Sequence, residues 1–168
     1  KESSGLDIHY TSIGSSAGSF RNVFMDSLNL DDDTIVYFLE NDYIHAPNSM
    51  NALFDGFDIG AHYVTLYDHP DKYISSYDYG EPTRVMKGNV CHWKMTISTT
   101  MTFAAKVSTL TEDKDIWIEN TGGSYPTDHQ AFTQLREKGR TLVSPIPGYS
   151  THGETAWLSP FRNWGEII

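Results

Sequence analysis

The stretch from Thr34 to Asp42 reads Thr-Ile-Val-Tyr-Phe-Leu-Glu-Asn-Asp and is the strongest signal in the sequence. Its apolar part, 34–39, is continuous and bounded by turn residues, a pattern typical of a strand buried on both faces in a parallel sheet. Two carboxylates, Glu40 and Asp42, follow this strand. Ligands of open α/β sheets bind beyond the carboxyl ends of the strands, so this position predicts a binding site.

A divalent cation would suit these carboxylates, because Mg²⁺ typically takes one or two carboxylates together with substrate phosphates. Glu40 and Asp42 are therefore candidate ligands. The alternative is that both are solvated residues that cap the helix expected after them.

Strands and helices alternate on either side of this stretch. Apolar patterns predict strands over 6–11, 62–67, 84–87, 94–103 and 141–144, and helices over 20–30, 46–56, 107–115 and 127–138. This alternation favours an α/β sandwich with a mainly parallel sheet. A chain of 168 residues fits a single domain, 1–168, and we expect its loop-rich tail, 145–168, to close the site.

Charge and cysteine content exclude several classes of function. The net charge of −10 argues against nonspecific binding to nucleic acid, which needs clustered Lys and Arg. The single cysteine, Cys91, excludes an internal disulfide and a multi-cysteine zinc site. No apolar run approaches the ~18 residues of a transmembrane helix, so we expect no membrane span and a cytoplasmic location.

The stretch 13–22, Ile-Gly-Ser-Ser-Ala-Gly-Ser-Phe-Arg-Asn, is followed by a predicted helix and then by the strand that ends in Glu40-Asn41-Asp42. In this order the elements resemble nucleotide-sugar glycosyltransferases of the GT-A fold, above all the family-2 group of inverting enzymes. Arg21-Asn22 matches the family's Arg-Asn element, and Glu40 replaces the first Asp of its acidic motif.

The resemblance implies a three-layer α/β/α sandwich and a metal-dependent sugar transfer. It implies that Asp42 holds a Mn²⁺ or Mg²⁺ ion on the diphosphate of a UDP- or GDP-sugar. It also implies that the rest of the donor site consists of Arg21, Asn22, Glu40 and Asn41. The strand–helix–strand that cradles the nucleotide base in this family would lie upstream of residue 1.

A second part of the likeness is the segment 122–130, Gly-Gly-Ser-Tyr-Pro-Thr-Asp-His-Gln, in which Asp128 resembles the family's catalytic base. Thr127 stands where an acidic residue is common in the family. A carboxylate at a helix N-terminus is stabilised by the helix dipole and can accept a proton from a hydroxyl within hydrogen-bond reach. The alternative is an N-cap, with Thr127 or Asp128 bonded to free N–H groups of the helix.

A third part is the segment 148–154, Gly-Tyr-Ser-Thr-His-Gly-Glu, in which His152 resembles the late-loop histidine that some GT-A enzymes add to the metal. A mixed Asp/His set suits Mn²⁺ better than Mg²⁺, which prefers oxygen. His129, beside Asp128, is the rival ligand, and a lone loop histidine is often only hydrogen-bonded.

The acceptor is expected to be a glycan or another compound with a free hydroxyl. Aromatic faces stack on sugar rings, and neighbouring polar groups bond sugar hydroxyls. The candidate acceptor residues are Trp93, Trp117, Glu119 and Tyr125. Each tryptophan could equally be an ordinary core residue.

Two other functions stay open. The run Gly14-Ser15-Ser16-Ala17-Gly18 matches the G-x-S-x-G nucleophile elbow, so Ser16 with a later Asp and His152 could form the triad of an α/β serine hydrolase. Only about a dozen residues precede this run, fewer than that fold places before its elbow. The second alternative is a non-catalytic carbohydrate-binding module, which would use the same aromatic and acidic side chains without nucleotide or metal.

Overall fold

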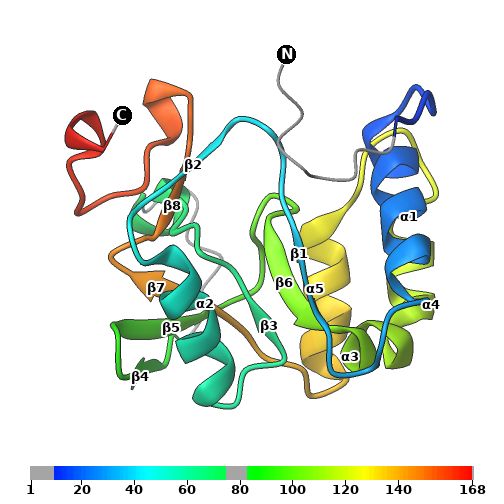
Figure 1. Cartoon of the computed structure of the whole chain (residues 1–168), viewed down its shortest axis with the longest axis horizontal. Coiled ribbons are helices and arrows are strands. Elements are labelled where there is room, and N and C mark those ends of the chain that lie inside the picture. Colours follow the sequence, from blue (N-terminus) through cyan, green and yellow to red (C-terminus); the bar gives the residue numbers. More distant parts are fainter. Residues whose placement is uncertain (1–9, 75–82, 168) are drawn as a thin grey trace.

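The computed structural model describes residues 10–74 and 83–167, and it is an α/β fold (Figure 1). The helices are α1 Ser16–Ser27, α2 Ser49–Asp58, α3 Val107–Glu112, α4 Lys114–Glu119 and α5 Asp128–Glu137, with short 3₁₀ turns η1 Pro70–Tyr73, η3 Thr155–Trp157 and η4 Trp164–Glu166. The strands are β1 Ile35–Phe38, β2 Tyr43–His45, β3 Tyr63–Val64, β4 Val85–Lys87, β5 His92–Thr96, β6 Phe103–Lys106, β7 Leu142–Ile146 and β8 Ser150–His152. In the part of the chain that the structure describes, no helix is both long and apolar enough to cross a membrane.

Six strands form one mixed sheet in the order β1-β6-β3-β7-β5-β4, and β2 pairs with β8 separately. Within the larger sheet β3 and β7 run parallel, whereas every other neighbouring pair runs antiparallel. The α/β class is therefore confirmed, but the prediction of a mainly parallel sheet is wrong. The stretch 34–39 forms β1, which lies at the sheet edge and pairs antiparallel with β6.

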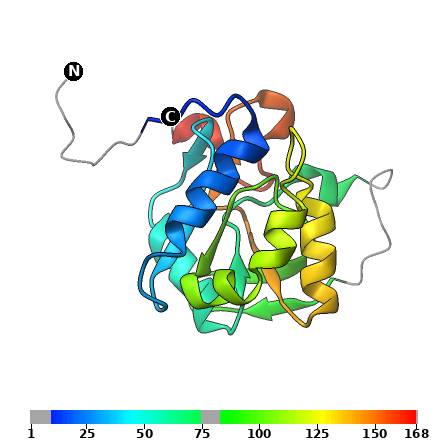
Figure 2. The same ribbon diagram turned by 90° about the vertical axis from the view of Figure 1, so that its right-hand side faces the viewer.

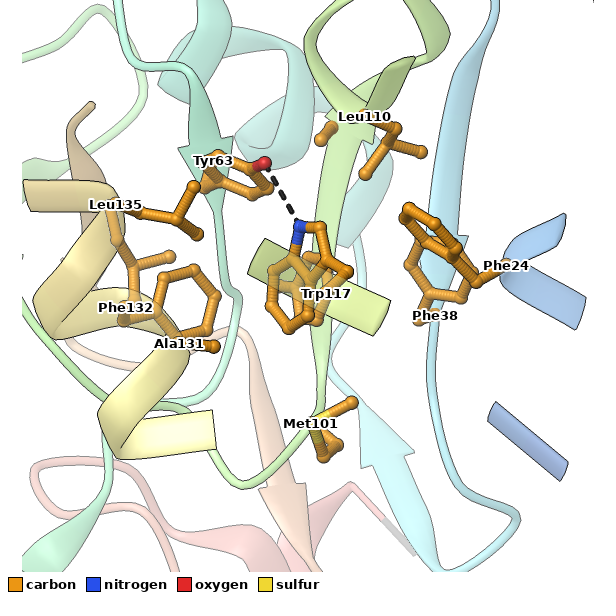
Figure 3. Close-up of a cluster of buried hydrophobic side chains, with 12 residues drawn as sticks. Phe24, Phe38, Tyr63, Met101, Leu110, Trp117, Ala131, Phe132 and Leu135 are labelled. Atoms are coloured by element: carbon orange, nitrogen blue, oxygen red, sulfur yellow. Dashed lines mark hydrogen bonds between the residues drawn. The ribbon is translucent and has the colours of Figure 1, made fainter. Parts of the chain in front are cut away.

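Helices cover both faces of this sheet. Successive side chains of a strand point to opposite faces, so neighbouring residues of one strand pack against different helices. On β3, Tyr63 belongs to a cluster with residues of α1, α3, α4 and α5, whereas Val64 belongs to a cluster with α2. Figure 2 shows α1, α4 and α5 side by side in front of the sheet. Figure 3 shows the first cluster, in which Trp117 Nε1 donates to Tyr63 Oη at 3.1 Å.

The predicted strand 94–103 is broken by a loop. β5 ends at Thr96 and β6 begins at Phe103, on the other side of β3 and β7 in the sheet. The loop between them, 97–102, places Thr100 and Met101 at φ values of 46° and 59°, a left-handed backbone that a strand does not contain. Since Phe103 pairs with Phe38, the loop lies at the carboxyl end of β1.

Other boundaries also differ from the sequence predictions. α1 begins at Ser16, before the start of the predicted helix 20–30, because Ser15 Oγ accepts the N–H of Gly18 and caps the helix. The predicted helix 107–115 is two short helices that meet at Asp113. Most of the predicted strand 6–11 lies outside the described residues, and Tyr10 and Thr11 form no strand.

Candidate active site

A cleft of about 480 Å³ opens between α1 and the carboxyl end of β1. Its walls are Ser16, Ser19, Phe20 and Val23 from α1, the run 36–42, Met101 from the loop 97–102, and Pro126. Most of this lining is apolar, and the run ends in Glu40, Asn41 and Asp42. The predicted acidic motif therefore lies in the wall of this cleft, which exceeds in volume the cavity of about 200 Å³ beside Tyr73.

Asp42 and His152 meet at the end of this cleft. The pairing of β2 with β8 sets Tyr43 opposite His152, and the N–H of Gly153 donates to the carbonyl of Asp42 at 2.8 Å. The side chains then face each other, with His152 Nε2 at 3.1 Å from Asp42 Oδ2. Two residues that the sequence predicted to share a metal ion are thus brought together by a small sheet of their own.

The donor atoms of this pair suit a divalent cation of borderline hardness, such as Mn²⁺, because they are a carboxylate oxygen and an imidazole nitrogen. Between residues 10 and 74 and residues 83 and 167, no group of three or more His, Cys, Asp or Glu side chains could hold a metal. Phosphate oxygens and water would have to complete the coordination, as is usual where a metal bridges a protein and a nucleotide.

The hydrogen bonds of His152 set a condition for metal binding. Its Nδ1 accepts the N–H of Glu154 at 3.1 Å, so the ring proton lies on Nε2, between the ring and Asp42. A metal on Nε2 would displace that proton to Nδ1. Binding through this nitrogen therefore requires the turn 153–154 to release Nδ1.

Electrostatics distinguish Glu40 from its neighbours in the cleft. Partial burial and the negative charge of Asp42 raise the pKa of Glu40, and the nearby His152 lowers it by less. The ionised form of Glu40 is thus less stable here than in water, and a cation next to Asp42 would offset part of this destabilisation.

Asp128 is the first residue of α5, and its carboxylate bonds to the loop 97–102. Oδ2 accepts the N–H of Thr99 at 3.2 Å and the N–H of Thr100 at 2.9 Å. Thr127 is the N-cap residue of α5, but its Oγ1 bonds to Asn120, and neither Thr127 nor Asp128 has a side-chain bond to the free N–H groups of the helix. The bonds of Asp128 hold Oδ2 and leave Oδ1 available to a ligand.

The loop 97–102 connects the two candidate centres. The hydroxyls of Thr100 and Tyr43 share a hydrogen bond of 2.7 Å, and the ring of Tyr43 meets that of His152 edge-on at 5.4 Å. Thr100 therefore contacts Asp128 through its N–H and Tyr43 through its side chain. This loop was predicted as part of a strand, because a Thr-rich run has the composition of a strand, and no sequence pattern pointed to Tyr43.

Arg21 and Asn22 do not line the cleft. Arg21 Nη2 donates to the carbonyl of Ile118, and its Nε donates to Thr121 Oγ1 at 3.3 Å, so this side chain ties α1 to the end of α4. Asn22 Nδ2 donates to Asp26 Oδ2 at 3.1 Å on the outer surface of α1. In these positions neither side chain contacts the space where a donor would lie.

The predicted acceptor residues separate into two groups. Trp93 and Trp117 are 0% and 1% exposed core residues, bonded through Nε1 to Asp55 and Tyr63, so neither presents a ring face to an acceptor. Glu119 is exposed at the end of α4. Tyr125 is exposed beside Pro126 in the cleft wall, so it alone of the four combines an open ring with a place at the cleft.

The serine-hydrolase motif has a structural explanation. Ser15 is the N-cap of α1, and Ser16 begins the helix. Ser16 Oγ donates to the carbonyl of Ser124 at 3.3 Å, and His152 is engaged with Asp42 and Glu154. The Ser- and Gly-rich run thus has the composition of a helix start.

The chain matches no protein-family model, no curated protein and no solved structure.

Proposed function

We propose that this protein is a metal-dependent glycosyltransferase with a GT-A-like fold, which moves a sugar from a nucleotide diphosphate sugar to a hydroxyl acceptor. The observation that carries the proposal is the contact between Asp42 and His152 beside Glu40 and Asn41, at the end of a cleft of about 480 Å³. The cleft is large enough for a small-molecule ligand. The chain carries a net charge of −10, so an anionic diphosphate needs a cation to bind here.

Asp42 and His152 are the residues that would hold the cation. A bound Mn²⁺ or Mg²⁺ would neutralise negative charge on the leaving diphosphate, which is the usual contribution of a metal to this class of reaction. Asn41 and Glu40 offer an amide and a carboxyl group to hydroxyls of the donor. The apolar wall between α1 and β1 keeps water away from one side of the donor.

Asp128 is the proposed base in a single displacement with inversion. Its Oδ1 removes the proton of the acceptor hydroxyl while the acceptor oxygen bonds to the anomeric carbon. The bond from that carbon to the diphosphate breaks, and the nucleoside diphosphate leaves with the electron pair. The two N–H bonds to Oδ2 fix the direction of the carboxylate, which is the positioning that general-base catalysis needs.

The test is calorimetric titration with UDP and then GDP, each with and without Mn²⁺, on the wild-type protein and on Asp42→Ala. We expect nucleotide binding that requires Mn²⁺ and that weakens at least roughly tenfold in the variant, since one metal ligand is lost. Asp58→Ala is the matched control, because Asp58 is an exposed aspartate at the end of α2, away from the cleft. Its affinity should equal that of the wild type.

Nucleotide binding that ignores Mn²⁺, or that survives Asp42→Ala unchanged, would contradict the metal site. Absence of binding by either nucleotide under all conditions would overturn the proposed donor and reopen the carbohydrate-binding alternative.

A further inference from the structure

The C-terminal tail exposes aromatic rings. Three of the four tryptophans are buried, whereas Trp157 on η3 is 37% exposed. Phe161 is 68% exposed and meets the ring of Tyr73 edge-on at 5.1 Å. Tyr73, at the end of η1, is itself 45% exposed. We call Tyr73, Trp157 and Phe161 the aromatic platform.

Buried polar contacts hold the platform in place. Tyr67 Oη donates to the backbone carbonyl of Trp157 at 2.6 Å. Tyr73 Oη donates to Asp68 at 2.7 Å and accepts from Lys94 at 3.1 Å, and Asp68 and Lys94 form an ion pair with both side chains buried. The Trp157 backbone and the Tyr73 ring are thus held in place although both side chains are partly exposed.

The backbone at Phe161 adds an independent sign of function. Its φ is 66°, in the left-handed region, where a bulky non-glycine residue is an outlier. A conformation of this kind costs free energy and persists only when the surrounding structure enforces it, and such residues cluster at binding sites. Here the strain keeps an exposed phenylalanine ring directed at Tyr73.

A chain of rings joins the platform to the candidate metal ligands. Tyr43, the neighbour of Asp42, contacts Tyr67 with ring centres 5.3 Å apart. Tyr67 contacts His69 at 5.1 Å, and His69 contacts Trp157 at 5.4 Å. The platform is thus packed, through Tyr67 and His69, against the element that carries Asp42.

The two lysines beside Tyr73 are paired with carboxylates. Lys94 is paired with Asp68 at 2.5 Å, and Lys72 lies 3.8 Å from Asp71. A second cavity of about 200 Å³ beside Tyr73 has Lys72, Lys94 and the hydroxyl residues Thr83 and Thr96 in its wall. With these lysines paired, the surface offers ring faces together with hydrogen-bonding groups, which is what a sugar requires.

We propose that the aromatic platform binds a neutral oligosaccharide and so forms the acceptor subsite of this enzyme, in place of the buried Trp93 and Trp117. Its role as an acceptor subsite rests on the proposed transferase function. Its ability to bind saccharide does not, because it depends only on the rings of the platform.

Trp157 provides a built-in reporter, since the other tryptophans are shielded from water. The test follows tryptophan fluorescence and calorimetric heat during titration with cellotetraose, xylotetraose, maltotetraose and chitotetraose, with tetragalacturonate as the charged counterpart. We expect at least one neutral tetrasaccharide to bind, and to bind more tightly than tetragalacturonate.

Two variants remove rings without disturbing the backbone. Trp157→Ala keeps the backbone carbonyl that accepts from Tyr67 Oη. Phe161→Asn introduces a residue that tolerates a positive φ. Each should weaken saccharide binding at least roughly tenfold by calorimetry, since exposed aromatic anchors often dominate an interface. Phe54→Ala, which removes an exposed phenylalanine from α2, is the matched control and should bind as the wild type does.

Failure of all the neutral tetrasaccharides to bind overturns the platform, and so does equal affinity in wild type, Trp157→Ala and Phe161→Asn. Tighter binding of tetragalacturonate overturns the inference of a neutral ligand. The nucleotide titration separates this result from the proposed function. Saccharide binding that depends on the platform, without nucleotide binding, would keep the platform and remove the transferase.

Discussion

The negative charge of Glu40 destabilises the folded protein at neutral pH. Partial burial and the negative charge of Asp42 raise the pKa of Glu40 above the ordinary value of 4.5, so the folded protein holds this proton more tightly than the unfolded chain does. Stability is then lost as the pH rises from about 4.5 through the raised pKa, because the folded state binds more protons over that range.

Replacing Glu40 with glutamine should therefore stabilise the protein above that range. The variant Glu40→Gln lacks the charge that Asp42 repels, so we expect its thermal midpoint at pH 7 to exceed that of the wild type. At pH 4 and below, the two midpoints should converge, since Glu40 is then protonated in the wild type as well. Midpoints measured from pH 3.5 to 8 test this, and a constant difference across that range would exclude the proposed repulsion.

At the scale of elements, the loop 97–102 and the start of α5 form one unit. Asp128 holds the loop by accepting two of its N–H groups, and it is also the proposed base. Mutation can separate these roles. An asparagine can still accept the N–H groups through its amide oxygen but cannot take a proton from a hydroxyl.

We predict that Asp128→Asn lowers turnover by roughly 10²–10⁴-fold, the usual share of general-base catalysis, with Mn²⁺-dependent nucleotide binding unchanged. Its thermal midpoint should stay close to that of the wild type. Asp128→Ala should lose turnover and stability together, because the N–H groups of Thr99 and Thr100 lose their partner. Turnover assays and thermal unfolding of both variants measure this. Near-normal turnover in Asp128→Asn would place the base elsewhere.

The elements also show what local sequence can and cannot specify. The apolar run 34–39 correctly predicts a strand, but apolarity reports burial and not the direction of the neighbouring strand. That direction is set by pairing with Phe103–Lys106, far along the chain. The Thr-rich run 94–103 has strand propensity throughout, yet contacts with Asp128 and Tyr43 hold its second half in a loop. Tertiary contacts overrode propensity there.

The candidate site was predictable to a similar degree. Glu40, Asn41 and Asp42 could be located because a strand end predicts a site, and resemblance paired Asp42 with His152. The contact between Asp42 and His152 depends on the pairing of β2 with β8, which no local sequence pattern predicts. Trp93 and Trp117 show the opposite case. Their composition suited a sugar site, but composition does not tell a buried ring from an exposed one.

For the molecule as a whole, Asp55 joins the helix on one face of the sheet to the far sheet edge. This buried residue of α2 accepts from Trp93 Nε1 on β5 at 2.8 Å, and from the N–H groups of Asn89 and Val90 in the turn between β4 and β5. Burial alone would raise the pKa of Asp55. These hydrogen bonds outweigh burial and lower its pKa below the ordinary value of 3.8.

The ionised carboxylate of Asp55 therefore stabilises the fold, and the protein should lose this stabilisation in acid. A carboxyl group with a lowered pKa stabilises the fold fully above pH 3.8 and loses that contribution as the pH falls through the lower folded value. We expect Asp55→Asn to be less stable than the wild type at pH 7, since its amide group cannot accept from all three donors. The difference in stability between the two proteins should narrow as the pH falls below about 4, when Asp55 of the wild type loses its charge. Denaturant unfolding of both proteins from pH 2 to 7 measures this, with Asp58→Asn in the same helix as the exposed control. A gap that stays constant down to pH 2 would show that the charge of Asp55 does not hold the sheet edge to α2.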